Sequence, residues 1–325
     1  MKRASGQIAI LLIGFNRFEL LDKRLRELSD VSVAQIPLYV ALDGPRSNRP
    51  DDYIARELIL KRLENDRQTC PNLILREVNL GCDTHIPFAI DELLEKHESV
   101  VVIEDDVHVD GKAILEIANQ VSFSTKAEVA CVAIGMSSIS RLAMIRKNRW
   151  RSSKYFSAWG FALNRAFWSV HKQVLIDAEE ANQIEVLMEN SRSWRKLNKR
   201  KQKIWEERFK RGNYDYKIQQ TLFARDMRAK SPLFRLVSNE GHGDENSTHT
   251  RFRKPHYLRK EVSSNSLKFS NKSVSIRFPF LIILDFLDSN TWAGDGLLSV
   301  RGRTFGIRSF TRKLIGFVSR SSCRR

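Results

Sequence analysis

Short apolar runs of strand length alternate with amphipathic segments through the first 135 residues of the chain. The apolar runs, rich in valine, isoleucine and leucine, cover residues 8–15, 37–42, 73–77, 100–103 and 129–134. The segments with helical character cover residues 17–28, 51–66 and 85–96, and a further helix starts near Gly111. Strand–helix alternation of this kind is typical of a mostly parallel sheet with helices on its faces. The sequence therefore predicts an α/β fold.

Composition narrows the class of protein. With 325 residues, of which 42% are hydrophobic, the chain can bury a large core. Its formal charge of +17 favours an anionic partner, which could be nucleic acid, lipid or a phosphorylated substrate. The four cysteines lack the CxxC spacing of a zinc site and are too sparse for a disulfide scaffold, so a reducing cytoplasm fits best. The apolar runs at residues 8–15 and 278–287 are too short to span a bilayer, and we expect no transmembrane anchor.

Basic residues gather in three parts of the chain. Residues 141–154 and 190–211 are rich in lysine and arginine, and we interpret both segments as exposed helix faces or mobile loops. The strand–helix alternation fades after about residue 250, and the chain from Val300 onward has eight basic residues and no acid. We therefore divide the chain into a folded domain at residues 1–250 and a basic C-terminal extension at residues 251–325.

Three consecutive acids end the most strongly apolar run. Glu104, Asp105 and Asp106 follow four aliphatic residues, so a buried strand would deliver them to the sheet edge where α/β proteins bind ligands. Carboxylate oxygens suit Mg²⁺ or Mn²⁺, and such a cation can neutralise the charge that grows on a nucleotide-diphosphate leaving group. The same acids are also consistent with a loop or the cap of the next helix.

Other polar residues follow the neighbouring strands. Arg17 follows the first strand, and Asp43 follows the second in an Asp-Gly-Pro turn. His85 lies at an expected helix start, where an imidazole can contact base or phosphate. Asp215 lies between Tyr214 and Tyr216, where partial desolvation would raise its basicity enough to deprotonate an acceptor hydroxyl. Arg17 is equally consistent with a solvated residue in the first turn of a helix, and taken alone Asp43, His85 and Asp215 are more typical of an ordinary turn, cap or structural residue.

A series of short motifs occurs in order across residues 12–250. They are Ile-Gly-Phe-Asn-Arg, Leu-Asp-Gly-Pro-Arg, Asn-Leu-Gly-Cys, Val-Ile-Glu-Asp-Asp, Phe-Ser-Ala-Trp-Gly and Gly-His-Gly-Asp-Glu-Asn-Ser-Thr-His-Thr. The series resembles the bacterial relatives of the GT-A-type nucleotide-sugar transferases, and more distantly the N-acetylglucosaminyltransferase I family. The resemblance covers about three quarters of the chain. It implies a GT-A (Rossmann-like) fold, with a mostly parallel central sheet flanked by helices.

The resemblance also implies roles for the residues around the donor. Asp106 looks like the carboxylate that binds the metal directly, and Glu104 and Asp105 look like the acids that support the donor. Arg17 and Asp43 are similar to nucleotide contacts after the first and second strands. The segment that begins Thr84-His85 is similar to a helix start whose histidine, here His85, touches the nucleotide.

A second set of residues is implied around the acceptor. Trp159 and Gly160 lie in a segment similar to the one that turns below the donor sugar, where Trp159 would stack on a ring or serve as a core residue. Asp215 is similar to the inverting general base, although Lys217 and Ile218 replace the more usual Gln-Trp after it. In the late histidine-rich stretch, His249 would complete the metal site or lie in a solvent loop.

These expectations combine into one function. We expect an inverting glycosyltransferase that uses Mn²⁺ or Mg²⁺ and a nucleotide-diphosphate sugar, with a UDP-sugar favoured, and that acts on a glycan or glycolipid acceptor in cell-surface polysaccharide or lipopolysaccharide synthesis. Its location would be cytoplasmic, with the basic extension on an anionic membrane surface. The alternatives are a nucleic-acid-binding protein that uses residues 190–211, a non-catalytic carbohydrate-binding relative, and a nucleotidyltransferase. No nucleic-acid fold signature or Gly-rich phosphate loop supports the first or the last.

Overall fold

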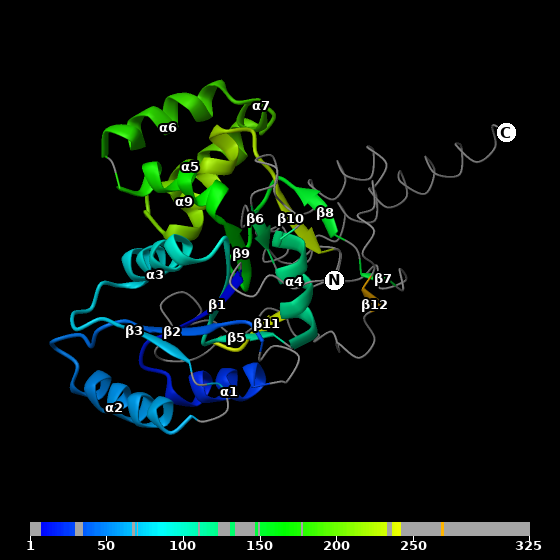
Figure 1. The fold of residues 1–325 in the computed structure, drawn as a ribbon. Coiled ribbons are helices and arrows are strands. Elements are labelled where there is room, and N and C mark those ends of the chain that lie inside the picture. The colour runs from blue at the N-terminus through cyan, green and yellow to red at the C-terminus, as the bar shows by residue number, and fades with distance from the viewer. Residues whose placement is uncertain are drawn as a thin grey trace, which may run out of the picture.

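The computed structural model shows the central domain (Figure 1). It describes residues 8–29, 35–66, 69, 71–109, 111–122, 131–133, 147–148, 150–176, 178–232, 236–241 and 268–269. The expected basic extension therefore lies outside the described residues except at Lys268–Phe269, and the division of the chain at residue 250 stays a prediction.

An eight-stranded sheet forms the centre of the described domain. Its strand order is β3-β2-β1-β4-β9-β6-β10-β8. The strands are β1 (Ile8–Gly14), β2 (Leu38–Leu42), β3 (Asn72–Leu75), β4 (Ser99–Glu104), β6 (Cys131–Ala133), β8 (Trp150–Ser153), β9 (Phe161–Asn164) and β10 (Ala229–Pro232). Only β9 and β8 run against the other six, because both β4 and β6 pair with β9 in antiparallel register and β10 pairs with β8 in the same way. The predicted mostly parallel α/β sheet is confirmed.

Two smaller pairings lie outside this sheet. β5 (Val107–Val109) pairs antiparallel with β11 (Val237–Asn239), and β7 (Lys147–Asn148) pairs parallel with β12 (Lys268–Phe269). The β5–β11 pairing joins Val237 to Val109, which are 128 positions apart, so it brings the chain after β11 back to the end of β4.

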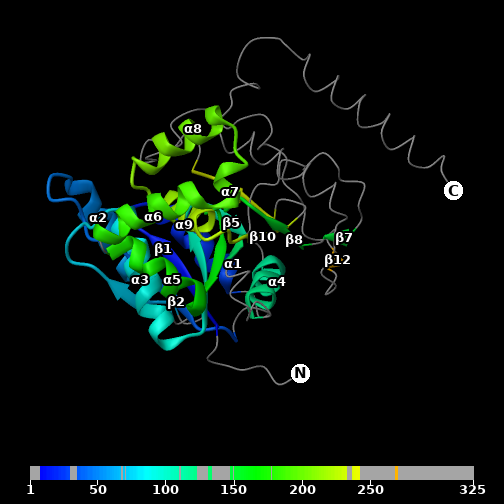
Figure 2. The same cartoon turned by 90° about the horizontal axis from the view of Figure 1, so that it is seen from above.

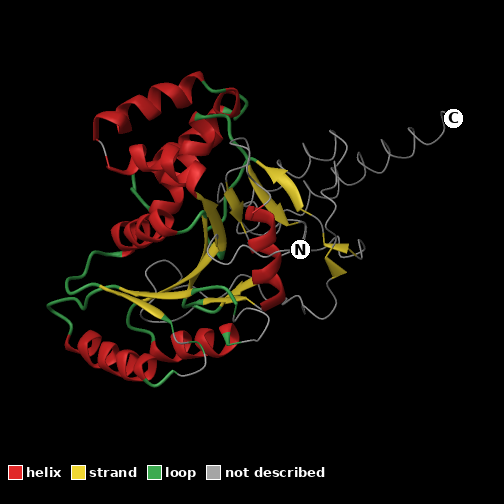
Figure 3. Cartoon of the chain, in the orientation of Figure 1, coloured by secondary structure: helices red, strands yellow, loops and turns green. Residues whose placement is uncertain are grey.

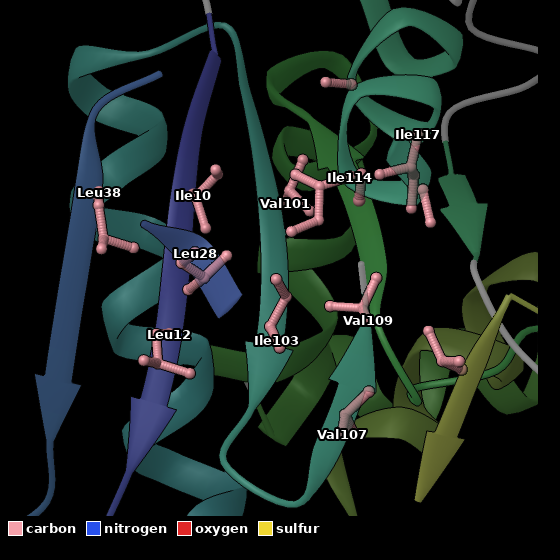
Figure 4. Close-up of a cluster of buried hydrophobic side chains, with 14 of the residues drawn as sticks. Ile10, Leu12, Leu28, Leu38, Val101, Ile103, Val107, Val109, Ile114 and Ile117 are labelled. Atoms are coloured by element: carbon pink, nitrogen blue, oxygen red, sulfur yellow. The ribbon is translucent and has the colours of Figure 1, made fainter. Parts of the chain in front are cut away.

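Helices cover both faces of the sheet (Figures 1 and 3). The described helices are α1 (Phe18–Leu28), α2 (Pro50–Glu64), α3 (Cys82–Lys96), α4 (Gly111–Ser122), α5 (Arg165–Ile176), α6 (Ala178–Asn190), α7 (Arg192–Arg195), α8 (Lys199–Phe209) and α9 (Tyr214–Ala224). One core, under α1, α2 and α4, includes Ile10 and Leu12 of β1; Figure 4 shows it with Val101 and Ile103 of β4. The other core, under α3, α5 and α9, includes Leu11 of β1. Successive residues of a strand point to opposite faces, so a strand buried on both faces is apolar throughout.

A third core holds together α6 to α9, which Figure 2 shows gathered on one side of the sheet. Trp194 and Trp205 are 4% and 2% exposed, and they pack around Phe223 with ring centroids 5.8 and 5.5 Å from it. The expectation that residues 190–211 are an exposed helix face or a mobile loop was therefore wrong for the aromatic residues. Most charged residues of α7 and α8 are exposed, whereas Trp194 and Trp205 lie on the buried side, together with Lys201.

Some boundaries also differ from those expected. The third helix begins at Cys82 rather than at residue 85, and the third strand is Asn72–Leu75 rather than residues 73–77. In the basic segment 141–154, the described residues include strand β8, whose Trp150 is 4% exposed and donates its indole N–H to Glu116 at 2.6 Å. None of the described helices is long and apolar enough to cross a membrane.

Candidate functional site

The first four strands place two polar loops side by side. β2 and β3 lie on one side of β1, and β4 lies on the other. The strand order therefore changes direction between β1 and β4, which is called the reversal point below. In open α/β sheets, ligands bind at the carboxyl ends of the strands at such a reversal point. Arg17 follows β1, and the acids Glu104, Asp105 and Asp106 end or follow β4. The backbone N–H of Asp105 still donates to Ile13 of β1 at 3.0 Å, which holds the two loops in register.

The Arg17 guanidinium bridges the two aspartates. Its Nε and Nη2 donate to the two carboxylate oxygens of Asp105, and its Nη1 donates to Asp106 Oδ2 at 3.1 Å. Burial by itself lowers the pKa of Arg17, but the two carboxylates more than offset this and hold it above its ordinary value. Burial raises the pKa of Asp105 to about 7 although Arg17 opposes the shift. The structure thus brings together three residues that the sequence marked separately.

Glu104 connects the acidic loop to α9. The hydroxyl of Tyr214, the first residue of α9, donates to Glu104 Oε1 at 2.9 Å. The backbone N–H of Tyr214 donates to Asp83 Oδ1 at 2.8 Å, in the first turn of α3. Burial, followed by the charge of Asp106, raises the pKa of Glu104 to about 8. The sequence marked Tyr214 only as a neighbour of Asp215, and its phenol is in fact a direct partner of the acidic triplet.

Replacing Glu104 by glutamine stabilises the protein at pH 8. The pKa of Glu104 is about 8 in the folded state against an ordinary 4.5, so the folded state resists the ionisation that the unfolded state undergoes freely. The contribution of Glu104 to stability therefore falls as pH rises from about 4.5 to 8 in the wild type, and glutamine removes this loss. We expect a gain of about 1 kcal/mol at pH 8 and none at pH 4. Urea unfolding at both pH values measures it, and an equal gain at both would contradict the titration argument.

Gly241 packs directly on Asp106. After β11, the backbone N–H of Glu240 donates to the Asp106 carbonyl oxygen at 2.7 Å. A Cβ at Gly241 would lie 2.5 Å from Asp106 Oδ2 and 3.1 Å from Arg17 Nη1, so any side chain here would occupy the space in front of the carboxylate. In the histidine-rich stretch that begins at Gly241, the sequence analysis singled out His249. The contact with Asp106 is instead made by Gly241.

An ion network anchors this glycine to α1. The Arg24 side chain is 1% exposed, and its Nη2 bonds Glu240 at 2.8 Å and Glu27 at 3.1 Å. Lys23 adds a second cation to Glu240 at 2.7 Å, and Glu27 also pairs with His108 Nδ1 at 2.8 Å. The network links α1, β5 and the residue that precedes Gly241. Sequence reasoning did not identify it, because its members are separated by up to 217 positions.

Asp43 is buried and bonds within the protein. Its Oδ1 accepts hydrogen bonds from the backbone N–H groups of Gly44 and Leu80. Its Oδ2 accepts one from the backbone N–H of Gly81 and one from the Asn79 side-chain amide, and all four bonds are 2.8–3.1 Å long. A carboxylate has about four acceptor positions. All four positions are therefore used within the protein, three of them to hold the 79–81 loop to the end of β2, and the nucleotide contact expected of Asp43 stays a prediction.

His85 lies in the first turn of α3 and is 1% exposed. Burial lowers the pKa of His85, with the charge of Asp43 opposing the shift. Neither ring nitrogen makes a well-formed hydrogen bond to a described residue. The lowered pKa favours the neutral form of this imidazole, and contact of His85 with a nucleotide stays a prediction.

Asp215 lies one residue from the side chain that bonds Glu104. It is partly exposed in the first turn of α9, and burial together with the charge of Asp83 raises the pKa of Asp215 to about 6. A carboxylate with this pKa is ionised at neutral pH yet more basic than an ordinary aspartate. It is therefore chemically suited to accept a proton from a hydroxyl.

The segment before β9 lies beside the end of β4. Phe161 pairs with Val102 in antiparallel register, so the residues that precede Phe161 run past the end of β4 toward the acids. Gly160 has φ of +63°, a conformation that disfavours any side chain, and Trp159 is partly buried against the core under α1. The structure places both residues on the acidic side of the sheet, and their contact with a sugar stays a prediction.

The acidic loop suits a divalent cation that is shared with a substrate. The described residues contain no group of three or more His, Cys, Asp or Glu side chains that could hold a metal alone, and His249 lies outside them. Mg²⁺ commonly binds through one or two carboxylates plus substrate phosphates and water. Asp106 offers hard oxygen atoms, and the missing side chain of Gly241 leaves room before them. The donor set fits such a cation.

No family model and no curated protein matches the chain. Solved structures with a similar fold include a mannosyltransferase from Pyrobaculum calidifontis in complex with GDP-Man and Mn²⁺, at 11% identity and a TM-score of 0.36, covering 68% of this chain and 69% of that one. TarS from S. aureus, at 12% identity and a TM-score of 0.35, covers 51% and 49%. A 4-diphosphocytidyl-2C-methyl-D-erythritol synthase from Anaerococcus prevotii, at 11% and 0.35, covers 54% and 77%.

Proposed function

We propose that this chain is a metal-dependent inverting glycosyltransferase that moves a sugar from a nucleotide-diphosphate sugar to a glycan acceptor. The observation that carries the proposal is the convergence of Arg17, Asp105 and Asp106 at the reversal point between β1 and β4, with Tyr214 bonded to Glu104 beside them. Such a site combines anionic metal ligands with a cation for phosphate. The ordered motifs that resemble GT-A-type transferases agree with it.

The residues would divide the work between leaving group and nucleophile. Asp106 would hold Mn²⁺ or Mg²⁺, and the cation supplies positive charge to the departing diphosphate. Glu104 and Asp105 would shape the donor site, with Arg17, Asp43 and His85 toward the nucleotide and Trp159 and Gly160 toward the sugar. Asp215 would take the proton of the acceptor hydroxyl as it attacks from the opposite face, which inverts the anomeric centre.

The finer identity of the partners belongs to the same proposal. We expect a UDP-sugar as donor, a glycan or glycolipid of the cell surface as acceptor, and a cytoplasmic location against an anionic membrane. A role in nucleic-acid binding is less favoured, because Trp194 and Trp205 of the basic segment are buried and are not exposed for stacking on bases.

A thermal-shift screen tests the donor site. UDP, GDP, CMP and their sugars, each with Mn²⁺, Mg²⁺ or EDTA, are compared on wild type, Asp106→Asn and Glu98→Gln. We expect one diphosphonucleotide to raise Tm by several degrees only with metal, because ligand at 100 times its Kd contributes about 2.7 kcal/mol. Asp106→Asn should lose the shift. Glu98 is a matched control, since it is an exposed carboxylate at the other end of β4.

The outcomes separate the competing functions. No shift with any nucleotide would remove the proposal, and salt-sensitive DNA binding would then favour the nucleic-acid alternative. A nucleotidyltransferase would be stabilised by a nucleoside triphosphate in preference to a sugar nucleotide. Binding without sugar transfer to any acceptor would identify a non-catalytic relative.

A further inference from the structure

Arg17 donates hydrogen bonds to the carboxylate oxygens that a cation at this site would bind. Three of the four carboxylate oxygens of Asp105 and Asp106 accept hydrogen bonds from its guanidinium. Gly241 lies on the other side of Asp106, and its lack of a side chain leaves room there, because a Cβ would lie 3.1 Å from Arg17 Nη1 and 2.5 Å from Asp106 Oδ2. Within the described residues, Arg17 is thus the counterion that is already in place between the two acids.

The two ion pairs of Arg17 are unequal. Asp105 is 3% exposed and is held by two guanidinium nitrogens, whereas Asp106 is 13% exposed and is held by Nη1 alone at 3.1 Å. Mg²⁺ needs a carboxylate oxygen at about 2.0–2.1 Å, and a divalent cation repels a guanidinium that donates to the same atom. The bond to Asp106 is therefore the one that can be exchanged, while the fork on Asp105 keeps the side chain in the site.

We propose that Arg17 holds the place of the metal in the free protein and transfers its Nη1 from Asp106 to the donor diphosphate when metal and donor bind. This inference rests on the proposed function. The side chain would pivot on Asp105, so the released N–H group would remain beside Asp106 and could donate to a donor phosphate. Arg17 thus makes metal binding costly without a donor and favourable with one.

Energetic coupling of this kind is reciprocal. If Arg17 weakens the binding of metal alone and strengthens that of donor with metal, each ligand must increase the affinity of the other. Removing the guanidinium should then change two affinities in opposite directions. A residue that only supports the fold would weaken both, so the signs of the two changes distinguish the roles.

The test is a pair of calorimetric titrations on wild type and Arg17→Gln. Without nucleotide, Mn²⁺ should bind Arg17→Gln about tenfold more tightly than wild type. With saturating Mn²⁺, the diphosphonucleotide found by the thermal-shift screen should bind Arg17→Gln about tenfold more weakly, within the usual range of coupling. Arg62→Gln is the matched control, because Arg62 also bridges two carboxylates, Asp22 and Asp66, away from the site. It should leave both affinities unchanged.

The outcomes keep this inference apart from the proposed function. Equal or weaker Mn²⁺ binding by Arg17→Gln, or no Mn²⁺ binding by either protein, overturns the place-holder role. If Arg17→Gln does not fold, Arg17→Lys keeps the charge without the fork and should still bind Mn²⁺ more tightly than wild type. The Mn²⁺ titration contains no donor, so tighter binding there supports the role of Arg17 even if no nucleotide binds and the proposed function fails.

Discussion

Replacing Asp215 by asparagine lowers kcat about 10²–10⁴-fold, the usual contribution of a positioned general base, and leaves the donor affinity unchanged. Asparagine keeps the size of the side chain and its hydrogen bond from the Tyr216 backbone N–H at 2.9 Å, but it accepts no proton from the acceptor hydroxyl. The loss should appear in sugar transfer and not in the metal-dependent thermal shift by the donor. Steady-state transfer assays with the two readouts side by side measure it.

The pH profile gives the same prediction a second readout. A base acts when it is deprotonated, so wild-type kcat/KM should fall as pH falls through about 6, the pKa of Asp215. The charge of Asp83 contributes to raising this pKa, so Asp83→Asn should keep its activity and move the acid limb to lower pH. If Asp215→Asn keeps a tenth of the activity, or keeps the acid limb, another group is the base.

The parts of the fold that could be predicted are those where burial produces a recognisable pattern in the local sequence. β1, β2 and β4 have helices on both faces, so their central residues form nearly continuous apolar runs, and in β4 only the end residues Ser99 and Glu104 are polar. β9 shows no such pattern, since its four residues end in Asn164 and its place between β4 and β6 depends on pairing rather than on its own sequence. Trp205 and Phe209 carried the signal of a buried helix face in their spacing, but the surrounding charges obscured it.

The site shows the same division. The acids could be located because they follow β4 directly, and the rule that ligands bind at strand ends applies to any such sequence. The contact of Arg17 with Asp105 spans 88 positions, and that of Gly241 with Asp106 depends on the β5–β11 pairing. Neither contact has a local signature. A sequence shows which residue types are available, whereas long-range pairing decides which of them meet.

Among the polar interactions of the described domain, we expect the ion network that joins α1 to Glu240 to be especially sensitive to substitution. Arg24→Met should reduce the free energy of unfolding by about 3 kcal/mol, because it removes the buried partner of the ion pairs and leaves Glu240 and Glu27 with only the more exposed Lys23 and His108 among the described residues. Glu240 and Glu27 both lose the contact with Arg24 Nη2, at 2.8 and 3.1 Å. Urea unfolding at pH 7 measures the loss.

Lys23→Met is the matched control for this prediction, since Lys23 bonds the same Glu240 carboxylate but is 51% exposed. An exposed pair contributes about 0–1 kcal/mol, so the two variants should differ by about 2 kcal/mol or more. Equal losses would mean that burial of Arg24 does not decide its role. Because Glu240 precedes the glycine that packs on Asp106, Arg24→Met should also weaken metal-dependent donor binding at temperatures where the protein is still folded, whereas Lys23→Met should not.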